Sequence, residues 1–577
     1  MQADSDLSAH KQKSPLNAGF SVAERFSGQF TEQWAGKFLT VIAAFICLLL
    51  LMPVAALIAE SIADSFRVEG DSTFSELADT VLWRYTLNSI SVVLGAIIFA
   101  CLLAVMPAWW CSHYEFKGRN ILQWAMVFPL AIPAYISGYI YTELFDYAGP
   151  IQSSLRAIFN WQSPQDYWFP DFRSRWGASL MLALALYPYI YLLLRNAFAR
   201  RSENLTNAAR LMGASRRRIF FTIELPLARP ALAIGCTLVA MESLADYGTV
   251  HLFAISTLTT AIYDSWLVYG SLTTAAKISC LMLLFVVLLV SAEKYQRRRQ
   301  QFFEGRNQKL SATKLQASNG RTFMIWLVCG SIVIAGFVYP VLTLLDYTLT
   351  YLSENLSGNL WQHSQSTFML AGSAAFIATL LALLFNAQLR FSPNRYHQSK
   401  LALSSLGYAI PGTVLAIGLL IPLTQADLWL NRLLVSMEHS RIGLFFSGTS
   451  FALIMAFVIR FAAISNGSIQ SAYQHMPANL DAASQILGAN RSETFTRIHW
   501  PLLRPAIISS LLLVFIECVK ELPASLLLRP FDFETLATYV FQYASDEQLE
   551  QAALGALLII VISLLPIVFL SRSQKMD

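Results

Sequence analysis

Long apolar stretches recur along the whole chain, and this recurrence constrains the fold more than any other feature. A helix needs about 20 mainly apolar residues to cross the hydrocarbon layer of a membrane. Twelve apolar stretches without a charge near the middle can be counted, some of them shorter than a full span because polar residues truncate them: 38–58, 87–110, 121–144, 179–194, 231–244, 278–290, 324–345, 368–384, 401–420, 444–458, 507–515 and 552–570. The sequence therefore predicts an all-α, polytopic membrane protein with about twelve transmembrane helices.

Composition supports this fold class. Of the 577 residues, 55% are hydrophobic and 13% are charged, whereas about 25% are charged in an average soluble domain. The first forty or so residues are polar, and the first apolar run is longer than the roughly 7–15 residues of a signal-peptide core. We therefore expect no cleavable signal. The seven cysteines form no CxxC pair, which favours small side chains within helices over metal ligands or disulfides.

The distribution of Lys and Arg predicts the orientation, because short cytoplasmic loops carry an excess of both. Basic segments fall on alternate loops and on both termini: 11–37, 117–119, 195–218, 294–321, 390–400, 491–504 and 572–575. The intervening loops 60–79, 258–274, 346–367 and 532–550 are acidic or poor in Lys and Arg. We expect both termini to be cytoplasmic and the number of spans to be even. The net charge of +5 follows from this sidedness, and nothing else favours nucleic-acid binding.

An internal repeat is the most informative pattern in the sequence. Gly213, Pro226 and Arg229 recur as Gly488, Pro501 and Arg504, each at a separation of 275 residues. The repeat extends into the spans, where 131–133 and 409–411 both read Ala-Ile-Pro. The predicted organisation is a cytoplasmic N-terminal segment (1–37), a first permease-like half (38–294), a cytoplasmic linker (295–321) and a second half (322–577). With six spans each, the two halves have the same orientation and form a parallel repeat.

The repeated loop is predicted to form two short helices, at 203–212 and 216–224. Gly213 supplies the conformational freedom for the turn between them, and Pro226 is expected to end the second helix. Paired small residues leave a surface suited to close docking, and Arg216–Arg218 could meet lipid phosphates or an acidic partner. A single copy would equally suit a basic loop that only anchors two spans. The second copy favours docking.

These loops resemble the cytoplasmic "EAA" loop of binding-protein-dependent ABC importer permeases, and each half of the chain is similar to one permease subunit. The resemblance implies that each loop seats in a cleft of a separate ATPase subunit, two copies in all, and that an extracytoplasmic binding protein delivers the substrate. It also implies a bacterial inner-membrane location. The implied coupling positions are Ala208, Ala209, Gly213, Ile223, Leu225, Pro226, Ala483, Ser484, Gly488, Ile498, Trp500 and Pro501.

The loops depart from the family pattern at its acidic position. Asn207 stands there in the first loop and Ala482 in the second, with Glu203 and Asp481 as the nearest alternative acids. No Gly-x-x-x-x-Gly-Lys-Ser/Thr stretch is present, so we expect ATP hydrolysis on the partner ATPase and not on this chain. ATP and Mg would then be bound by the partner. We expect no cofactor, no metal site and no enzymatic activity in this chain.

Ionisable residues inside predicted spans are the second candidate site, since each costs roughly 2.5–3.5 kcal/mol at mid-span. Glu242 and Asp246 share one helical face, as do Glu517 and Glu521, with Lys520 beside them. Gly248 and Pro523 are expected to break each helix just beyond the acids, as in the discontinuous helices of transporters. Two interpretations stay open: a transport path for a cation, or an interhelical polar network that fixes the halves together.

The same stretches narrow the resemblance. Residues 517–524, 528–531 and 245–249 are similar to those of fused permeases from ferric-iron importers, which implies ferric ion as the substrate. Branches that import thiamine, sulfate, molybdate or polyamines share the fold and the loops. A twelve-span secondary transporter and a membrane-embedded enzyme are the alternatives from other classes. A secondary transporter has no reason to repeat a Gly-centred loop, and an enzyme would need convergent catalytic groups.

Overall fold

The computed structural model describes residues 22–66, 72–199, 203–298, 315–356 and 359–573. The chain divides into two compact units, 1–49 and 50–577. Helix α1 (Val22–Ser65) runs across the boundary between them, and its first part is all that is described of the first unit. Everything below concerns the second unit.

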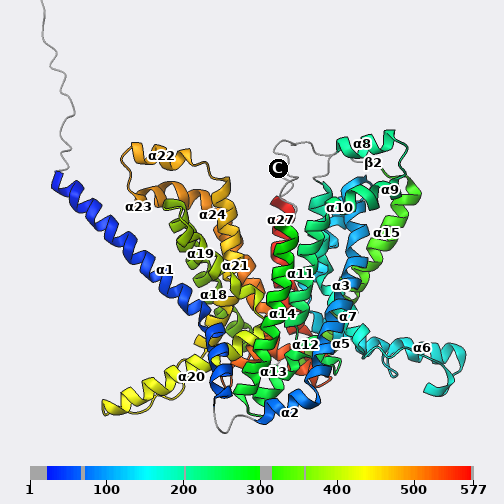
Figure 1. Cartoon of the computed structure of the whole chain (residues 1–577). Coiled ribbons are helices and arrows are strands. Elements are labelled where there is room, and N and C mark those ends of the chain that lie inside the picture. Colours follow the sequence, from blue (N-terminus) through cyan, green and yellow to red (C-terminus); the bar gives the residue numbers. More distant parts are fainter. Residues whose placement is uncertain (1–21, 67–71, 200–202, 299–314, 357–358, 574–577) are drawn as a thin grey trace, which may run out of the picture. The chain divides into compact units, whose positions relative to one another are not determined.

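Helices make up nearly all of the described chain (Figure 1). The first half contains α2 (Ser72–Thr80), α3 (Leu82–His113), α4 (Arg119–Ala125), η1 (Phe128–Ala131), α5 (Ala134–Phe145), α6 (Pro150–Phe159), η2 (Pro164–Asp166), α7 (Arg175–Ala199), α8 (Glu203–Leu211), α9 (Arg216–Ile219), η3 (Phe220–Glu224), α10 (Leu225–Leu227), α11 (Arg229–Ala245), α12 (Gly248–Leu252), α13 (Leu258–Leu267) and α14 (Leu272–Arg298).

The second half contains α15 (Asn319–Val333), η4 (Ile334–Val338), α16 (Tyr339–Thr350), α17 (Leu352–Asn355), α18 (Asn359–Phe391), α19 (Arg395–Ser404), η5 (Leu406–Ala409), α20 (Gly412–Ser436), α21 (Ser450–His475), α22 (Asn479–Ile486), α23 (Arg491–Thr494), η6 (Phe495–His499), α24 (Trp500–Lys520), α25 (Pro523–Leu528), α26 (Leu536–Ser545), η7 (Leu549–Ala552) and α27 (Ala553–Ser573).

The predicted fold class is confirmed. Within the described residues, ten helices are long and apolar enough to cross a membrane, and there are twelve if each of two bent pairs counts as one span. The bent pairs are Arg119–Ala131 with Ala134–Phe159, at 91°, and Arg216–Leu227 with Arg229–Ala245, at 67°. Both lie in the first half, so each half supplies six candidate spans.

Two predicted spans are wrong in detail. The stretch 401–420 is not a continuous helix, because α19 ends at Ser404 and α20 begins at Gly412. The stretch 121–144 is also interrupted, because α4 ends at Ala125 and α5 begins at Ala134. Pro411 lies directly before α20 in an extended conformation, with ψ 146°, just as Pro133 lies before α5 with ψ 136°. A proline disfavours helical backbone in the residue before it, which explains both breaks.

The repeat seen in the sequence is present in the structure down to single hydrogen bonds. The backbone N–H of Leu258 donates to Ser89 Oγ at 2.8 Å, and that of Leu536 donates to Thr367 Oγ1 at 2.8 Å. These bonds fix the start of α13 to α3 and the start of α26 to α18. Both helices also begin with a Thr capping box, at 257–260 and 535–538. The halves are therefore built by the same local rules.

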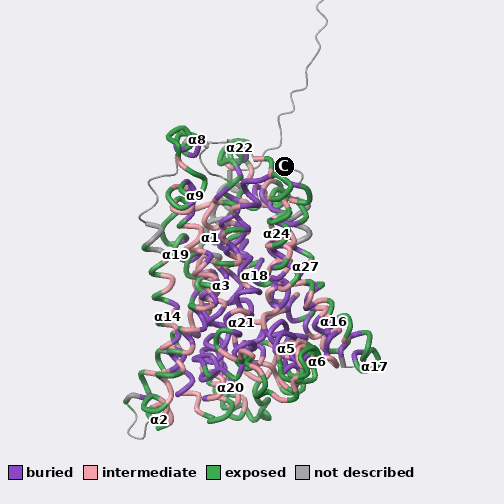
Figure 2. The backbone as a smooth tube through the Cα atoms, turned by 90° about the vertical axis from the view of Figure 1, so that its right-hand side faces the viewer, coloured by how far each residue is buried: buried purple, intermediate pink, exposed green. Residues whose placement is uncertain are grey.

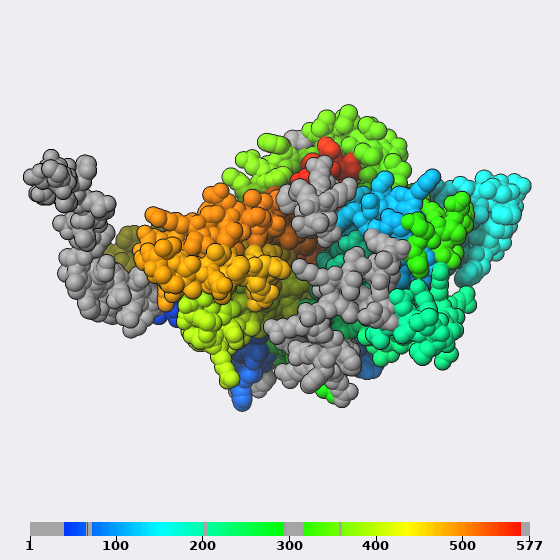
Figure 3. Space-filling model, turned by 90° about the horizontal axis from the view of Figure 1, so that it is seen from above, coloured from blue at the N-terminus to red at the C-terminus, as the bar shows by residue number. Residues whose placement is uncertain are grey.

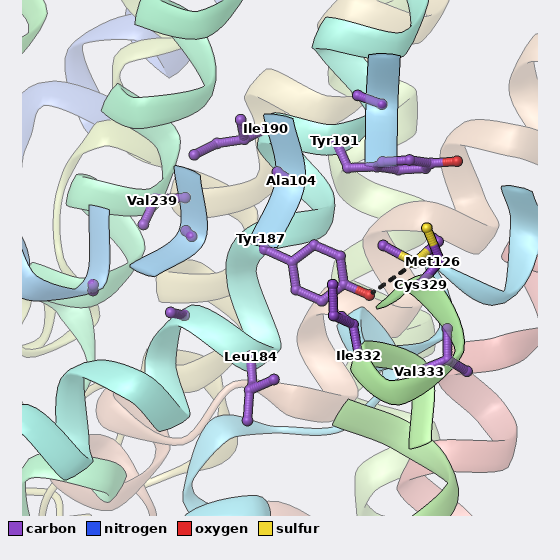
Figure 4. Close-up of a cluster of buried hydrophobic side chains, with 14 of the residues drawn as sticks. Ala104, Met126, Leu184, Tyr187, Ile190, Tyr191, Val239, Cys329, Ile332 and Val333 are labelled. Carbon is purple, nitrogen blue, oxygen red and sulfur yellow. Dashed lines mark hydrogen bonds between the residues drawn. The ribbon is translucent and has the colours of Figure 1, made fainter. Parts of the chain in front are cut away.

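Each half is completed by the first span of the other half. Ile325, Cys329, Ile332 and Val333 of α15 pack into the apolar core formed by α3, α4 and α7. Figure 4 shows Cys329, Ile332 and Val333 beside Tyr187 and Met126, whose hydroxyl and sulfur lie 4.0 Å apart. In the reverse direction, a Cβ added to Gly418 of α20 would lie 2.7 Å from the carbonyl oxygen of Pro53 in α1. Burial of this apolar surface joins the two halves.

The end of the predicted linker is held against the first half. Residues 299–314 lie outside the described chain, and Leu315–Gln316 (β2) pairs in parallel with Tyr114–Glu115 (β1). The indole N–H of Trp326 donates to the carbonyl of Lys117 at 3.0 Å. The boundaries predicted for the linker, 295–321, remain a prediction.

The predicted charge sidedness matches the arrangement of elements. Figures 1 and 2 place α8, α22 and the C-terminal end of α27 at one end of this unit, and α2 and α6 at the other. The segments rich in Lys and Arg, 203–218 and 491–504, belong to the first end. The colouring of Figure 2 shows buried residues concentrated in the helices between the two ends.

Candidate functional site

The two repeated loops have the predicted helix-turn-helix form. Gly213 follows α8 with φ +81°, and Gly488 follows α22 with φ +82°. Side chains with a Cβ rarely adopt this left-handed backbone, so glycine is required for the turn. After the turn, Ser215 caps α9 through the N–H of Arg218, and Asn490 caps α23 through the N–H of Glu493. The predicted role of the two glycines as turn residues is confirmed.

The prediction that Pro226 ends the second helix is wrong. The chain remains helical through α10 and bends only after Leu227. In the second loop, Pro501 lies inside an unbroken span, Arg491–Lys520. Both prolines closely follow a five-residue π-helical segment, η3 or η6. Inside a regular α-helix, a proline ring clashes with the carbonyl group four residues before it. The wider π turn moves that carbonyl group away from the ring, so the helix continues past the proline.

Burial at the predicted coupling positions follows the repeat. Ala208 and Ala483 are exposed, whereas Ala209 and Ser484 are buried. The paired small residues therefore do not form one exposed surface, because only the first of each pair faces outward. Gly213 and Gly488 are both exposed, and Ile223 and Ile498 are both half-buried. The two loops differ at the next positions. Leu225 and Pro226 of the first loop are half-buried, whereas Trp500 and Pro501 of the second loop are exposed.

Apolar side chains at the tip of each loop were missed by the sequence analysis. Leu211 and Met212 are 90% and 83% exposed, and Ile486 and Leu487 are 85% and 86% exposed. We call these four residues the tip residues. They occupy equivalent positions in the repeat, directly before Gly213 and Gly488. A repeated apolar pair beside each turn glycine was the sequence signal that could have identified them. The space-filling view in Figure 3 shows the two loops on one face of the molecule, α8 in teal and the α22–α23 segment in orange.

Buried charges hold each loop to the spans below it. In the first half, Glu224 of η3 accepts from Trp109 Nε1 at 2.6 Å and lies 2.8 Å from His113 Nε2. The equivalent residue of the second half is His499, which lies 2.8 Å from Asp481 of α22. Asp481 is also paired with Arg390 at 2.6 Å. Each loop thus connects rigidly to a span, but through different partners.

These contacts correct one expectation about the acidic position. Asp481 faces inward, with 18% of its side chain exposed, and is occupied by Arg390 and His499. It therefore does not replace the missing acid on the outer surface of the second loop. The side chain of Glu203 lies outside the described residues.

The second candidate site is a single cavity between the halves. Its empty volume is ≈ 820 Å³, including its open side, and its lining contains all five residues singled out in the spans: Glu242, Asp246, Glu517, Lys520 and Glu521. Residues from both halves meet there, including Tyr135 and Tyr189 of the first half and Phe461 of the second. The repeat thus brings its two acidic stretches to one place.

The helices break beside this cavity, at a slightly different point from the one predicted. Helix α11 ends at Ala245 and α24 at Lys520, while Asp246 and Glu521 are extended, with ψ 127° and 111°. Gly248 and Pro523 already belong to the next helices, α12 and α25. Asp246 accepts from the N–H of Thr249 at 2.8 Å, and Glu521 accepts from that of Ala524 at 3.2 Å. Each acid therefore also caps the helix that follows it.

Arg460 of α21 is a functional candidate that the sequence analysis missed. It lines the cavity with only 5% of the residue exposed, and its Nη1 lies 3.4 Å from Glu521 Oε1. The predicted span 444–458 ended two residues before Arg460, so this arginine was not recognised as a charged residue inside an apolar helix. That placement was itself the signal, because charged residues inside spans are rare and costly.

The other cavity contacts also cross between elements. Tyr408 of η5 donates to Glu242 Oε1 at 2.9 Å and so joins the second half to the first. Lys520 pairs with Glu517 at 3.3 Å on the same helix. Among the described residues, no group of three or more His, Cys, Asp or Glu side chains is arranged to hold a metal ion. The cavity is acidic, but it is not a preformed metal cage.

The charges of the cavity are distributed unequally between the halves. Each half contributes two acids, yet both bases, Arg460 and Lys520, come from the second half. At the spacing of the repeat, their counterparts in the first half are Ala185 and Ala245, which also line the cavity. The first-half wall is therefore negative, and the second-half wall carries its own counter-charges.

Comparison with known proteins agrees with the duplicated architecture. Residues 96–301 and 378–576 each match the family described as "Binding-protein-dependent transport system inner membrane component". The chain is 23% identical over 495 residues to the Fe(3+)-transport system permease protein FbpB 2 of Haemophilus influenzae, covering 84% of this chain and 89% of that protein.

Two further relatives extend the comparison. The Ferric transport system permease protein FbpB of Actinobacillus pleuropneumoniae is 24% identical over 458 residues, which cover 75% of this chain and 63% of that protein. The Molybdenum transport system permease protein ModB of Escherichia coli K12 is 30% identical over 172 residues, which cover 30% of this chain and 71% of that protein.

Proposed function

Because the chain belongs to the family of binding-protein-dependent transport system inner membrane components, we propose that it is the transmembrane permease subunit of an ATP-driven importer, with two permease halves fused in one chain. The observation that carries the proposal is the duplicated loop. Two loops of the same geometry, each turned by a left-handed glycine and tipped by exposed apolar residues, lie on one face of the unit.

Each loop docks one ATPase subunit in this proposal. Covering exposed apolar surface with a partner stabilises a complex by about 25 cal/mol per Å², and each of the four tip residues is at least 83% exposed. The coupling positions Gly213 and Gly488 set the turn, while Ile223, Leu225, Pro226, Ile498, Trp500 and Pro501 lie on the segment that leads into the span. ATP and Mg are bound by the two ATPase copies, and this chain binds no cofactor.

Alternating access follows from the same arrangement. Closure of the ATPase pair moves the two loops, and the buried pairs Glu224 with His113 and Asp481 with Arg390 pass that movement to the spans. An extracytoplasmic binding protein delivers the substrate at the opposite end. Both termini then lie in the cytoplasm and the chain resides in the bacterial inner membrane.

Ferric ion is the substrate we propose. A relative that matches 84% of this chain carries "Fe(3+)-transport" in its name, and the cavity between the halves contains four acids against two bases. Glu242, Asp246, Glu517, Lys520 and Glu521 line the route. Molybdate is the second candidate, because a molybdenum permease is among the relatives and Arg460 and Lys520 could meet an oxyanion. Thiamine, sulfate and polyamines remain alternatives from related branches.

Docking is tested by charging the tip residues. Leu211→Glu with Met212→Glu, and separately Ile486→Glu with Leu487→Glu, should lower ATPase copurification about tenfold or more, because a carboxylate buried without a partner is costly. Trp168→Glu is the matched control, since Trp168 is 85% exposed on the loop that contains α6, away from both coupling loops. Normal copurification in both double variants would contradict docking through the loops.

Substrate choice is tested by uptake into vesicles that contain the purified complex. Binding-protein-delivered ferric ion, molybdate, sulfate, thiamine and a polyamine are offered separately, each at the same concentration. We expect ATP-dependent accumulation of ferric ion. Accumulation of molybdate alone would replace the proposed substrate, and accumulation of any substrate on an ion gradient without ATP would indicate a secondary transporter.

A further inference from the structure

Arg460 differs from every other charged group of the cavity in how it is held. Its Nε and Nη1 atoms are buried without a hydrogen-bond partner. By contrast, Asp246 accepts three hydrogen bonds and Glu242 accepts one from Tyr408. A buried guanidinium normally forms directed, often paired hydrogen bonds with carboxylates. At these two nitrogens, Arg460 is therefore held by charge and not by a directed hydrogen bond to a described residue.

The carboxylates around Arg460 provide that charge. Glu521 is the nearest, with 3.4 Å between Oε1 and Nη1, and Glu242 and Glu517 are also within electrostatic reach. The positive charge of the guanidinium thus compensates several acids from both halves, and neither Nε nor Nη1 forms a directed hydrogen bond to any of them.

The backbone leaves room for this pair. A Cβ added to Gly412, the first residue of α20, would lie 2.4 Å from Glu521 Oε1 and 2.6 Å from Arg460 Nη1. The two side chains therefore occupy the space that any other residue at 412 would fill. The equivalent residue in the first half is Ala134, and the counterpart of Arg460 there is Ala185.

We propose that Arg460 is a tethered resident cation: its guanidinium occupies the acidic cavity between transport cycles and is displaced from Glu521 by an incoming multivalent metal cation. This inference rests on the proposed function, because it takes the cavity as the route and a cation as the substrate. The guanidinium offsets part of the negative charge while the cavity is empty. The guanidinium also opposes the entry of monovalent cations. A single positive charge would only replace the charge of the displaced guanidinium, with no net gain in attraction to the acids.

The first-half wall then receives the substrate first. Glu242 and Asp246 line the cavity without a base from their own half. Arg460 is within electrostatic reach of Glu242 but forms its ion pair with Glu521, so an incoming cation reaches Glu242 and Asp246 before it displaces that pair. Arg460 and Lys520 keep the second-half acids occupied until the cation approaches. Because only the second-half wall carries bases, a cation would move from the first-half acids to the second-half acids. Two identical halves would give no such order.

The test is binding of Tb³⁺, a trivalent probe whose luminescence is sensitised by nearby tyrosines such as Tyr135 and Tyr189 of the cavity. The purified full chain in detergent is titrated without ATP and without a binding protein. Arg460→Met should bind Tb³⁺ at least about tenfold more tightly than the unaltered chain, because a like charge near the site is removed. Arg460→Lys keeps the charge and should bind as weakly as the unaltered chain.

Two further arms keep the test decisive. Arg460→Ala should bind Tb³⁺ tightly, and free guanidinium ion should compete with that binding; this arm serves if Arg460→Met does not fold. Glu242→Gln in the Arg460→Met background should weaken Tb³⁺ binding again, which locates the probe in the cavity.

Equal Tb³⁺ affinity in the unaltered chain and in both uncharged variants would overturn the proposal. So would binding of molybdate by the unaltered chain that is lost in Arg460→Met, because Arg460 would then be an anion receptor. Failure of this inference is distinguishable from failure of the proposed function. Ferric uptake with unchanged Tb³⁺ affinities refutes only the tethered cation, while the expected Tb³⁺ pattern without ATP-driven uptake refutes only the importer.

Discussion

Glu521 shows how one side chain can carry two tasks in the cavity. It caps α25 through the N–H of Ala524 and pairs with Arg460, which has no hydrogen bond from Nε or Nη1. Removing its charge leaves the cap largely in place, because a Gln carbonyl oxygen still accepts. The two tasks can therefore be separated by substitution.

Glu521→Gln should destabilise the complex. Arg460 would lose its nearest counter-charge and keep only the more distant Glu242 and Glu517. We therefore expect a cost below the value of about 3–5 kcal/mol for a buried charge left wholly unpaired. We expect a melting temperature lowered by several degrees in detergent. Glu242→Gln is the matched comparison, because Tyr408 can still donate to the amide oxygen; it should melt normally and transport severalfold less. A lowered melting temperature with intact uptake in Glu242→Gln would instead indicate a structural polar network.

Gly213 and Gly488 allow a second test at single positions. Apart from the chain neighbours, no described heavy atom lies within 4 Å of a Cβ added at either site, so strain within this chain would come from φ near +80° and not from a clash. Gly213→Val and Gly488→Val should each strain the turn by about 1–2 kcal/mol and lower uptake relative to ATP hydrolysis. Gly→Asn at the same sites is the control, since Asn tolerates this conformation. Equal coupling ratios in the Val and Asn variants would contradict the role of the turn.

The sequence predicted the acids of the cavity but not their partners. Glu242, Asp246, Glu517 and Glu521 were recognisable because an acid in an apolar stretch is costly. Tyr408 carries no such signal, since a tyrosine is common in apolar helices. Arg460 did carry the signal, but its own charge led the predicted span to stop at Val458, two residues before it.

At the scale of elements, the two repeated loops have the same backbone form, but their buried charges pair with different residues. Both loops contain a glycine turn, a π-helical segment and a proline. The glycine and the proline were readable from the constant spacing, whereas the π-helical segment was not predicted. The residue at the end of each π-helix is Glu224 in one half and His499 in the other. Which charge it meets depends on α3 or α22, so the pairing could not be predicted from either loop alone.

Asp481→Asn should loosen the second loop and leave the first unchanged. The substitution removes the charge that both Arg390 and His499 face. Hydrogen exchange of the α22 amides should become several times faster, while the α8 amides keep their rates. Asp546→Asn, at an exposed acid far from both loops, is the control. Unchanged exchange in α22 would show that Asp481 does not hold this loop.

At the scale of the whole molecule, the apolar pattern predicted twelve spans in two halves, and the structure agrees. It did not predict that α15 completes the core of the first half, because an apolar helix face does not specify its partner. Packing between Cys329, Ile332 and the residues around Tyr187 depends on shape complementarity, which only the folded chain shows.

Sidedness can be tested by labelling single introduced cysteines with a membrane-impermeant maleimide. Trp168→Cys should react from the outside of intact cells and Met212→Cys only in inverted vesicles, because the basic end of the unit is expected to face the cytoplasm. None of the seven native cysteines is fully exposed, so background labelling should be low. The reverse pattern would invert the proposed orientation.

The central claim is that ATP hydrolysis on a separate subunit drives uptake through this chain. The most direct measurement is accumulation of ferric ion in proteoliposomes that contain the purified chain and its ATPase, with ATP inside and the loaded binding protein outside. We predict accumulation against a gradient that stops when ATP, the ATPase or the binding protein is left out. Accumulation by the chain alone on an ion gradient, or unchanged accumulation without the ATPase, would contradict the account.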